Sequence, residues 1–518
     1  MGVKVSSDGK KVQVPFDAQF AQSLMQWGVP HKHIGDTTAF PLTDTTWRIA
    51  RSFYELPSPM SLRYKYPGFT PMSHQIHGAN HLAYRQRAQL WSAIGTGKTS
   101  MSLWAMDYCM TYHKCSRVLV LAPKSTLINV WGTHLSRMMP YRKYEVLKGS
   151  SVDKAAQVRS TKAQIVVANH DSTRYVADAL QQWAPDIIIV DEQTVYGNIT
   201  SGRTKGLRQL IKSGTRVWFL TGKPMPDTPM NVHGPAHITC PSRVPKQMSA
   251  FRPMVMWQTA GGFWKPRTDA PEIIAGLLGD AVLRINREDC FDLPPTTFTA
   301  TKCEPSKGLV HIIRKLKAEA EVALSEATVV ATTEAVYRIK ILQSACGAVK
   351  TQNAKGEDVA VTIDCDSKFE ALADILDGTD RPVLLFTPYR APLEALHKWL
   401  TRHKIPTVVV HGGTSMSSRT EAFRAIAQNE AKVLLAVPDA MAHGINELTV
   451  SDTIVWWGAP ATNRVYDQAN GRIVRMGQNQ KTYIIHLASC KLERVSYERL
   501  MQKRALEGSL LELIRTVV

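Results

Sequence analysis

The chain has 518 residues, 44% of them hydrophobic, which is enough for several buried cores and excludes an intrinsically disordered protein. No apolar run reaches the ~20 residues that a membrane-spanning helix needs, and the polar N-terminus lacks the apolar centre of a signal peptide, so we expect a soluble, cytoplasmic protein. A formal net charge of +19 favours a polyanionic partner, DNA or RNA, although a solubilising surface would give the same charge. The eight cysteines include no pair with C-x-x-C spacing, which argues against a zinc site or a redox pair.

The first 62 residues form a small N-terminal accessory region. Residues 11–15 are predicted as a strand, and residues 18–27 and 46–54 as helices. Because a region of this size has too little core to be stable alone, we expect it to dock onto the rest of the chain.

Short, almost uniformly apolar strands then alternate with helical segments in two successive series. The strands of the first series are predicted at residues 88–93, 118–123, 165–169, 187–191 and 217–221, and those of the second at 383–388, 407–411, 433–437, 453–457 and 482–487. Runs of this kind are typical of strands buried on both faces of a parallel sheet. We therefore predict an α/β protein with two tandem parallel-sheet domains, at residues 63–288 and 289–518.

The residues between the two series differ in character. Residues 287–295 end in two prolines and are predicted as a linker, and residues 306–348, rich in Ala, Glu and Lys, as a long helical insertion. The cations near residues 311–317 of this insertion either contact nucleic acid or form an ordinary solvated face.

A phosphate-binding loop lies between the strand at 88–93 and a helix predicted at residues 101–112. It is a Walker A motif with Ser92 in place of the first glycine. The glycines let backbone N–H groups turn toward the phosphates, Lys98 reaches the β and γ phosphates, and the Thr99 hydroxyl coordinates Mg²⁺. ATP and Mg²⁺ are therefore the predicted cofactors, bound by Gly95, Thr96, Gly97, Lys98, Thr99 and Ser100.

Two carboxylates follow the apolar strand at residues 187–191. In a phosphoryl-transfer site, Asp191 would hold Mg²⁺ and Glu192 would orient and polarise the attacking water. An isolated Asp-Glu pair after a strand is an ordinary polar strand end, but together with the phosphate loop it predicts catalytic carboxylates.

The order of motifs from residue 70 to residue 500 resembles that of superfamily 2 helicases, and within them the Swi/Snf-like DNA translocases of bacteria and bacteriophages. The residues that carry this resemblance furthest run from Gln468 to Gln478 and include Arg472, Arg475 and Gly477. Positions 468, 472 and 475 are predicted to share one face of a helix that ends at Gly477. A solvated basic helix is the alternative.

The resemblance implies two RecA-like domains that close on one ATP. Arg472 and Arg475 would then enter the site from the second domain and stabilise the charge of phosphoryl transfer. Gln75 would read adenine, and Gly444, in a loop with an atypical His443, would line the nucleotide site.

Further motifs imply coupling and DNA contact. Residues 221–223 correspond to the motif that couples hydrolysis to domain motion, but Lys223 replaces its usual threonine, which leaves the coupling contact open. Lys124 and Ser125, at the start of a helix, suit a backbone phosphate, although Ser125 or Thr126 could instead cap an ordinary helix. Thr387, at the end of a strand, is the third expected DNA contact.

The resemblance predicts an ATP-dependent DNA helicase or translocase that moves along or remodels duplex or branched DNA independently of sequence. We expect a monomer from a bacterial or phage-infected cell, with roles in repair or recombination. The alternatives are an RNA helicase, the motor subunit of a restriction or defence complex, and a nucleic-acid clamp that does not hydrolyse ATP.

Overall fold

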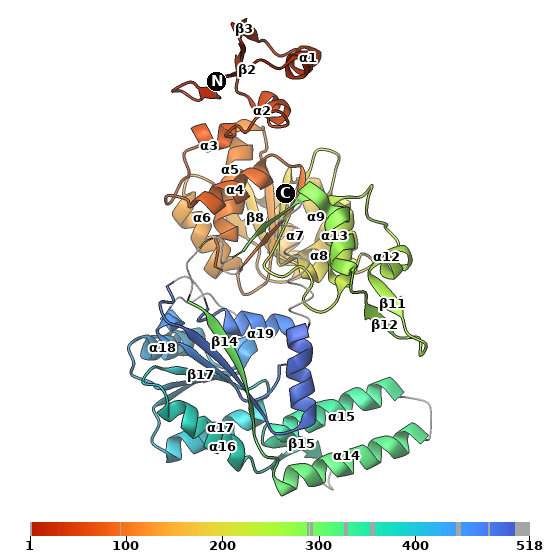
Figure 1. Cartoon of the computed structure of the whole chain (residues 1–518), viewed down its shortest axis with the longest axis vertical. Coiled ribbons are helices and arrows are strands. Elements are labelled where there is room, and N and C mark those ends of the chain that lie inside the picture. Colours follow the sequence, from red (N-terminus) through yellow and green to blue (C-terminus); the bar gives the residue numbers. More distant parts are fainter. Residues whose placement is uncertain are drawn as a thin grey trace.

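The computed structural model describes residues 3–93, 95–286, 290, 294–325, 330–352, 358–441, 447–460, 462–474 and 477–502. Figure 1 shows three parts stacked along the long axis: the N-terminal region, a first α/β domain and a second α/β domain. Within these residues, no helix is long and apolar enough to cross a membrane.

The N-terminal region is a four-stranded antiparallel sheet, in the order β1-β2-β4-β3, with two helices. Its elements are β1 Lys4–Val5, β2 Lys11–Pro15, α1 Ala18–Gln26, β3 Lys32–Ile34, β4 Thr37–Pro41 and α2 Asp44–Ala50. Val12, Phe20, Leu24 and Phe40 belong to its small core. The strand at 11–15 and the helix at 18–27 are confirmed, whereas the helix predicted at 46–54 ends four residues early.

One carboxylate attaches this region to the first domain. Asp44 Oδ1 accepts hydrogen bonds from the hydroxyls of Tyr84 and Tyr108, both at 2.9 Å, and Asp44 Oδ2 pairs with His113. Although burial acts to raise the pKa of Asp44, the bonds from His113, Tyr84 and Tyr108 hold that pKa below its usual value. The docking expected for so small a region is therefore present.

The first domain is built on a seven-stranded, all-parallel sheet in the order β13-β5-β10-β9-β6-β8-β7. Its strands are β5 Arg87–Ser92, β6 Val118–Ala122, β7 Tyr144–Val146, β8 Ile165–Asn169, β9 Ile187–Asp191, β10 Arg216–Thr221 and β13 Val282–Ile285. All five predicted strands are confirmed to within one residue. The two that were not predicted, β7 and β13, are the edges of the sheet.

Helices cover both faces of this sheet, because successive strand residues point to opposite sides and both sides are apolar. Along β6, Val118 and Val120 belong to one core, and Leu119 and Leu121 to the other. The α-helices are α3 Pro59–Arg63, α4 Ser73–Ala83, α5 Lys98–Tyr112, α6 Thr133–Met138, α7 Ser151–Ser160, α8 Ser172–Tyr175, α9 Ala177–Trp183, α10 Gly202–Leu210, α11 His233–Thr239, α12 Met248–Val255 and α13 Ala270–Leu278.

The second domain has a six-stranded, all-parallel sheet in the order β14-β21-β20-β17-β19-β18. Its strands are β14 Thr296–Lys302, β17 Val383–Phe386, β18 Thr407–Val410, β19 Val433–Ala436, β20 Thr453–Trp456 and β21 Thr482–Ala488, and the helices around it are α16 Asp366–Asp377, α17 Arg390–Arg402, α18 Met416–Ala427 and α19 Asn463–Asn470. The predicted fold class, two tandem RecA-like α/β domains, is confirmed.

The helical insertion is a pair of helices rather than the single stretch expected at 306–348. Its helices, α14 Lys307–Ser325 and α15 Val330–Ala345, pack against each other and project sideways from the second domain (Figure 1). A small hairpin follows, formed by β15 Ala348–Gln352 and β16 Asp358–Thr362. The domain boundary placed at residues 288 and 289 lies outside the described residues, as does most of the linker at 287–295.

Candidate functional site

The phosphate loop joins the carboxyl end of β5 to the start of α5, as predicted. Gly95 (φ 87°) and Gly97 (φ 95°) both take the left-handed conformation that favours glycine, and they turn the loop back on itself. The hydroxyls of Ser92 and Thr96 hydrogen-bond to each other, so the serine that replaces the usual glycine braces the loop. The Lys98 ammonium donates to the Ser92 carbonyl at 2.8 Å and therefore lies over the loop.

The hydroxyls that follow the loop differ in accessibility. Thr99 is half-buried, whereas Ser100 is buried and only 3% exposed. Of these two side chains, the hydroxyl of Thr99 is the one that a ligand in the loop can reach.

Gln75 lies directly against the phosphate loop. Its amide nitrogen donates to the Thr96 carbonyl at 3.2 Å, and its amide oxygen accepts from the Met72 N–H at 3.1 Å. A Cβ built at Gly97 would lie 2.5 Å from the Gln75 nitrogen, so a side chain there would displace the end of Gln75, and the φ of 95° independently favours glycine. The structure therefore places Gln75 at the nucleotide loop, as the sequence predicted.

The order of strands brings the predicted acids to this loop. Because β10 lies between β5 and β9, the segments that follow three neighbouring strands meet at the carboxyl edge of one sheet. They carry Lys98 after β5, Lys223 after β10, and Asp191 with Glu192 at the end of β9.

Asp191 and Glu192 stand side by side at the end of β9, and the pKa of Asp191 reflects that crowding. Burial, and then the neighbouring Glu192, raise the pKa of Asp191 to about 6, although Lys98 and the Trp131 indole act to lower it. Glu192 takes a left-handed backbone conformation (φ 58°), which ends the strand and directs the chain into the 3₁₀ turn Gln193–Tyr196. A cation between these carboxylates would relieve their repulsion, so the donors fit Mg²⁺.

Trp131 is a site residue that the sequence did not predict. Its indole Nε1 donates to Asp191 Oδ2 at 3.1 Å, and its side chain is fully buried. Trp131 belongs to a π-helical turn, Leu127–Gly132, in which the Trp131 N–H reaches back to the Thr126 carbonyl at 3.0 Å. Turns of this type are rare and are common at functional sites. No spacing rule links residues 60 positions apart, so the sequence held no signal for this bond.

The second domain reaches the site through α19. Lys223, in the segment after β10, forms an ion pair with Asp467 near the end of α19. The lysine that replaces the usual threonine thus makes a direct contact between the two domains. Asp467 was not among the predicted site residues.

The predicted arginine-bearing helix differs from the one observed. The expected continuous helix through residues 468, 472 and 475 is wrong at Arg472, because α19 ends at Asn470 with Gly471 as its C-cap. Arg472 lies in the turns that follow, and Gly477 has the positive φ, 93°, expected of it. Residues 475 and 476 before it lie outside the described residues, so its role as a helix cap stays a prediction. Arg475 lies outside the described residues, as do Gly444 and His443.

The three expected DNA contacts lie in different environments. Lys124 is exposed and Ser125 is half-buried, in the turn between β6 and the π-helical turn. Thr126 takes the N-cap position of this turn, but its side chain makes no capping hydrogen bond, and its hydroxyl donates to the Pro123 carbonyl at 3.0 Å instead. Thr387 is fully buried, and its hydroxyl donates to the Tyr389 carbonyl at 3.3 Å. The structure therefore places Thr387 in the interior of the second domain, away from any surface that a phosphate could reach.

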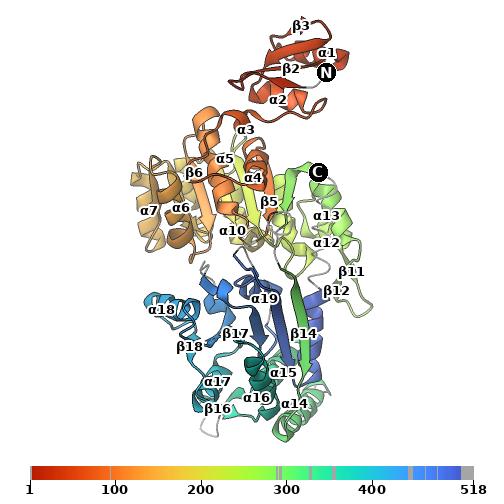
Figure 2. The same cartoon turned by 60° about the vertical axis from the view of Figure 1, so that its left-hand side comes forward.

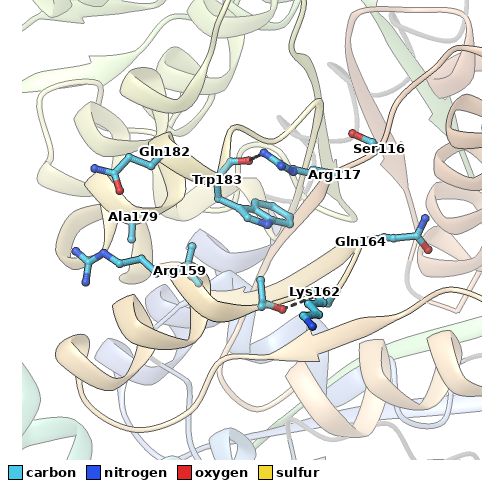
Figure 3. A pocket seen from close by; sticks show the side chains of 11 residues that line it. Ser116, Arg117, Arg159, Lys162, Gln164, Ala179, Gln182 and Trp183 are labelled. Carbon is cyan, nitrogen blue, oxygen red and sulfur yellow. Dashed lines mark hydrogen bonds between the residues drawn. The ribbon is translucent and has the colours of Figure 1, made fainter.

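A separate hollow of about 550 Å³ lies at the opposite edge of the first sheet (Figure 3). Its lining residues Arg117 and Gln164 directly precede β6 and β8, so the hollow opens at the amino ends of the strands. The Arg117 guanidinium donates to the Trp183 carbonyl at 2.5 Å. This hollow contributes nothing to the nucleotide site.

Two protein-family models match the chain. The model described as "Type III restriction enzyme, res subunit" matches residues 68–194, and the model described as "Helicase conserved C-terminal domain" matches residues 367–477. The first match contains the phosphate loop and the two carboxylates, and the second contains α19 and the residues after it.

Similar proteins come from a phage, a bacterium and an animal. The chain is 26% identical to "Putative protein p41" of Acyrthosiphon pisum secondary endosymbiont phage 1, over 86% of this chain and 99% of that protein. It is 23% identical to "Uncharacterized ATP-dependent helicase YqhH" of Bacillus subtilis (strain 168), over 82% of this chain and 76% of that protein. It is 22% identical to "SWI/SNF-related matrix-associated actin-dependent regulator of chromatin subfamily A-like protein 1" of Xenopus tropicalis, over 82% of this chain and 43% of that protein.

Among solved structures, the chain is similar to the "Sulfolobus solfataricus SWI2/SNF2 ATPase core in complex with dsDNA". The two chains share 17% sequence identity with a TM-score of 0.42, and the match covers 89% of this chain and 97% of that one.

Proposed function

Since the chain is an ATP-hydrolysing superfamily 2 helicase of the Swi/Snf-like branch, we propose that it moves along duplex or branched DNA by closing and opening its two domains around one ATP. The observation that carries this proposal is the ion pair between Lys223 and Asp467. Lys223 follows β10, which lies between the strand of the phosphate loop and the strand of the carboxylates. The second domain therefore contacts the centre of the candidate site.

The first domain would bind the nucleotide. Lys98, which donates to two carbonyls of its own loop, would exchange these bonds for the β and γ phosphates. Gln75, whose amide nitrogen donates to the Thr96 carbonyl of the loop, would read the adenine edge. Glu192, turned away from its strand by its left-handed conformation, would orient and polarise the attacking water.

Thr99 and Asp191 would hold Mg²⁺. The accessible hydroxyl of Thr99 and the carboxylate of Asp191, with its raised pKa, are oxygen donors of the kind that this ion prefers. When bound, Mg²⁺ would neutralise charge on the phosphates.

The second domain would complete the site only when the domains close. Arg472 follows Asp467 by five residues, and it would approach the γ phosphate together with Arg475. Arginines supplied in this way accelerate phosphoryl transfer by ~10³–10⁵-fold. Loss of the γ phosphate after hydrolysis would release this contact, and the domains would reopen.

Contacts with the DNA backbone would convert this cycle into movement. Lys124 and Ser125 stand exposed or half-exposed at the carboxyl edge of the first sheet, where they would grip a phosphate. Phosphate contacts carry no sequence information, so movement would be independent of sequence and sensitive to salt. We extend the proposal to a monomer in the cytoplasm of a bacterial or phage-infected cell, acting in DNA repair or recombination.

One rival has an observation in its favour. The family model matching residues 68–194 is described as the res subunit of a type III restriction enzyme, which suits the motor subunit of a defence complex. That match ends just after Glu192 and contains the phosphate loop, the candidate DNA contacts Lys124 and Ser125, and the two carboxylates, but no nuclease motif was found in the sequence. The size of the native assembly separates these functions, because a defence motor would be isolated with a nuclease partner and a self-sufficient translocase would not.

ATP turnover in the presence of different nucleic acids tests the proposal. We expect covalently closed duplex DNA and four-way junctions to stimulate the wild-type protein more strongly than duplex RNA, and Lys98→Ala to abolish turnover. Equal or stronger stimulation by RNA would reject the DNA assignment. Turnover unaffected by any nucleic acid, or by Lys98→Ala, would reject the motor itself.

A further inference from the structure

A β-hairpin projects from the first domain beside its junction with the second (Figures 1 and 2). Its strands, β11 Met256–Gln258 and β12 Trp264–Pro266, pair antiparallel, with Trp257 opposite Lys265 and Gln258 opposite Trp264. Nothing in the nucleotide site or in the candidate DNA contacts accounts for this hairpin.

The tip of the hairpin is held by its own hydrogen bonds. The Thr259 N–H donates to the Phe263 carbonyl at 2.8 Å, and the Thr259 hydroxyl accepts from the Phe263 N–H at 3.2 Å. Gly262, with φ 79°, makes the turn between them, and its carbonyl accepts from the Gln258 amide at 3.0 Å. Phe263 is therefore presented by an ordered loop.

The two faces of the hairpin have different surroundings. Because side chains alternate along a strand, Trp257, Phe263 and Lys265 lie on one face and Trp264 on the other. Trp264 packs against a core that includes Phe251. Trp257 and Phe263 are 48% and 73% exposed, and the Lys265 ammonium lies 5.9 Å from the centre of the Trp257 ring. Two large rings with a cation beside them are thus held in solvent.

The charge around the hairpin identifies the chemistry of its partner. Residues 227–269 contain five Lys and Arg residues and two acids, Asp227 and Asp269, of which Asp269 pairs with Arg267 at 2.6 Å. The net charge of this segment is positive, which favours a polyanion over a neutral or basic protein surface. Single exposed apolar side chains are common, but aromatic rings on a basic surface are the combination that binds single-stranded nucleic acid by base stacking. Bases inside a duplex are already stacked on each other, so the bases that are available to stack on Trp257 and Phe263 are unpaired ones.

We infer that the β11–β12 hairpin stacks unpaired DNA bases where strands separate at a fork or junction. The inference rests on the proposed function, because movement along duplex DNA is what would bring such a branch to the hairpin. Trp257 and Phe263 would supply the stacking surfaces, and Lys265 would pair with a phosphate of the same strand. The hairpin would thereby distinguish branched DNA from plain duplex.

The test uses the full-length protein and two labelled DNAs, a closed duplex and a fork with two single-stranded arms. Variants Phe263→Ala and Trp257→Ala/Phe263→Ala are compared with Tyr112→Ala, which removes a 55% exposed ring at the far end of α5. We expect the double variant to bind the fork about 10-fold more weakly and the closed duplex as before. 2-Aminopurine at the first unpaired position should be quenched by the wild type and by Tyr112→Ala, but not by the double variant.

Unchanged fork affinity in both hairpin variants would overturn the inference, and it is also the result expected if the rings bind a protein. An equal loss on fork and closed duplex would overturn it too, because it would indicate phosphate contact without stacking. Phe263 lies at an exposed tip, so Phe263→Ala alone keeps the test valid if the double variant fails to fold. ATP turnover stimulated by closed duplex tests the proposed function separately. If the hairpin variants keep both the turnover and the fork affinity of the wild type, the hairpin role is rejected and the proposed function is not.

Discussion

The indole Nε1 of Trp131 donates to Asp191 Oδ2 at 3.1 Å, and this bond joins the helix after the candidate DNA-contact loop to a carboxylate of the nucleotide site. Trp131 lies only six positions after Ser125 in the chain. A phosphate bound at that loop would therefore act close to the residue that positions Asp191.

Replacing Trp131 by phenylalanine preserves most of the buried volume but removes the donor. We expect Trp131→Phe to lower ATP turnover about 10-fold or more at limiting Mg²⁺, as is typical when a group that orients a metal ligand is lost. Because the indole acts to lower the pKa of Asp191, the acid limb of the pH–rate profile should also move to higher pH. The matched control is Trp104→Phe, which removes a buried indole donor to the Pro67 carbonyl outside the site. Identical Mg²⁺ and pH dependences in the two variants would contradict a role at Asp191.

Removing the charge of Asp191 should stabilise the nucleotide-free protein while ending catalysis. The folded-state pKa, about 6, lies above the ordinary value of about 3.9, so the ionised carboxylate opposes folding. This penalty is absent below pH ~4, grows as pH rises to about 6, and is complete above that pH. We expect Asp191→Asn to raise the free energy of unfolding by up to ~3 kcal/mol at pH 7.5 without Mg²⁺, and to raise the Tm accordingly. At pH 4 the substitution should have little effect on either quantity. Asp374→Asn, which removes an exposed carboxylate on α16, is the control. A Tm at pH 7.5 that is lower for Asp191→Asn than for the wild type would refute this prediction.

The Lys223–Asp467 ion pair should couple the two domains. We expect Lys223→Ala and Asp467→Ala each to reduce DNA-stimulated turnover, and the exchanged pair Lys223→Asp/Asp467→Lys to recover much of it. Partners in contact typically give coupling energies of ~0.5–3 kcal/mol in a double-mutant cycle. The control cycle uses Lys302 and Glu304, an exposed pair within the second domain. Strictly additive effects of the two alanine variants would show that the contact is incidental.

A second ion pair is purely structural. Lys368 and Glu493 are both fully buried and pair at 2.7 Å, and the ammonium also donates to the Trp457 carbonyl at 2.8 Å. Burial is the strongest influence on Lys368 and acts to lower its pKa, but Glu493 together with the nearby Cys346 and Cys365 outweighs it and raises that pKa to about 12. The pair therefore stabilises the fold below pH ~10.5, and this contribution is lost as pH rises through about 12.

Breaking this pair from one side should be costly. Lys368→Met leaves a buried carboxylate without its partner, and we expect it to destabilise the protein by ~3–5 kcal/mol at neutral pH. Lys368→Met/Glu493→Gln should recover most of that loss, because no charge is left buried. Thermal unfolding measures both, and a double variant no more stable than the single one would contradict the assignment.

The sequence predicted those parts of the fold that are uniformly apolar and central. The inner strands of both sheets were predicted because most of their side chains are buried on both faces, as along Val118–Ala122. The edge strand Thr296–Lys302 was missed because its residues are exposed or half-buried and read as a polar segment. The insertion was predicted as one helix because residues 306–348 share one composition, in which no Gly or Pro marks the division between α14 and α15.

The residues of the candidate site also fall into a group that the sequence predicted and a group that it did not. Motif residues such as Lys98 and Asp191 were predicted because their chemistry requires fixed types at fixed spacing. Trp131 and Asp467 were missed because their roles depend on which strands are neighbours and on how the domains meet. The helix through Arg472 was predicted too long, since arginine spacing indicates a shared face but does not show where a helix ends.

Displacement of a third strand from duplex DNA tests the central claim most directly. In this assay a protein that moves along the duplex dislodges a triplex-forming oligonucleotide in its path, whether or not it separates the two strands beneath. If the chain is an ATP-driven DNA translocase, the wild-type protein should release the oligonucleotide with ATP, and Lys98→Ala should not. Duplex-stimulated ATP hydrolysis by the wild type without release of the third strand would contradict movement along DNA.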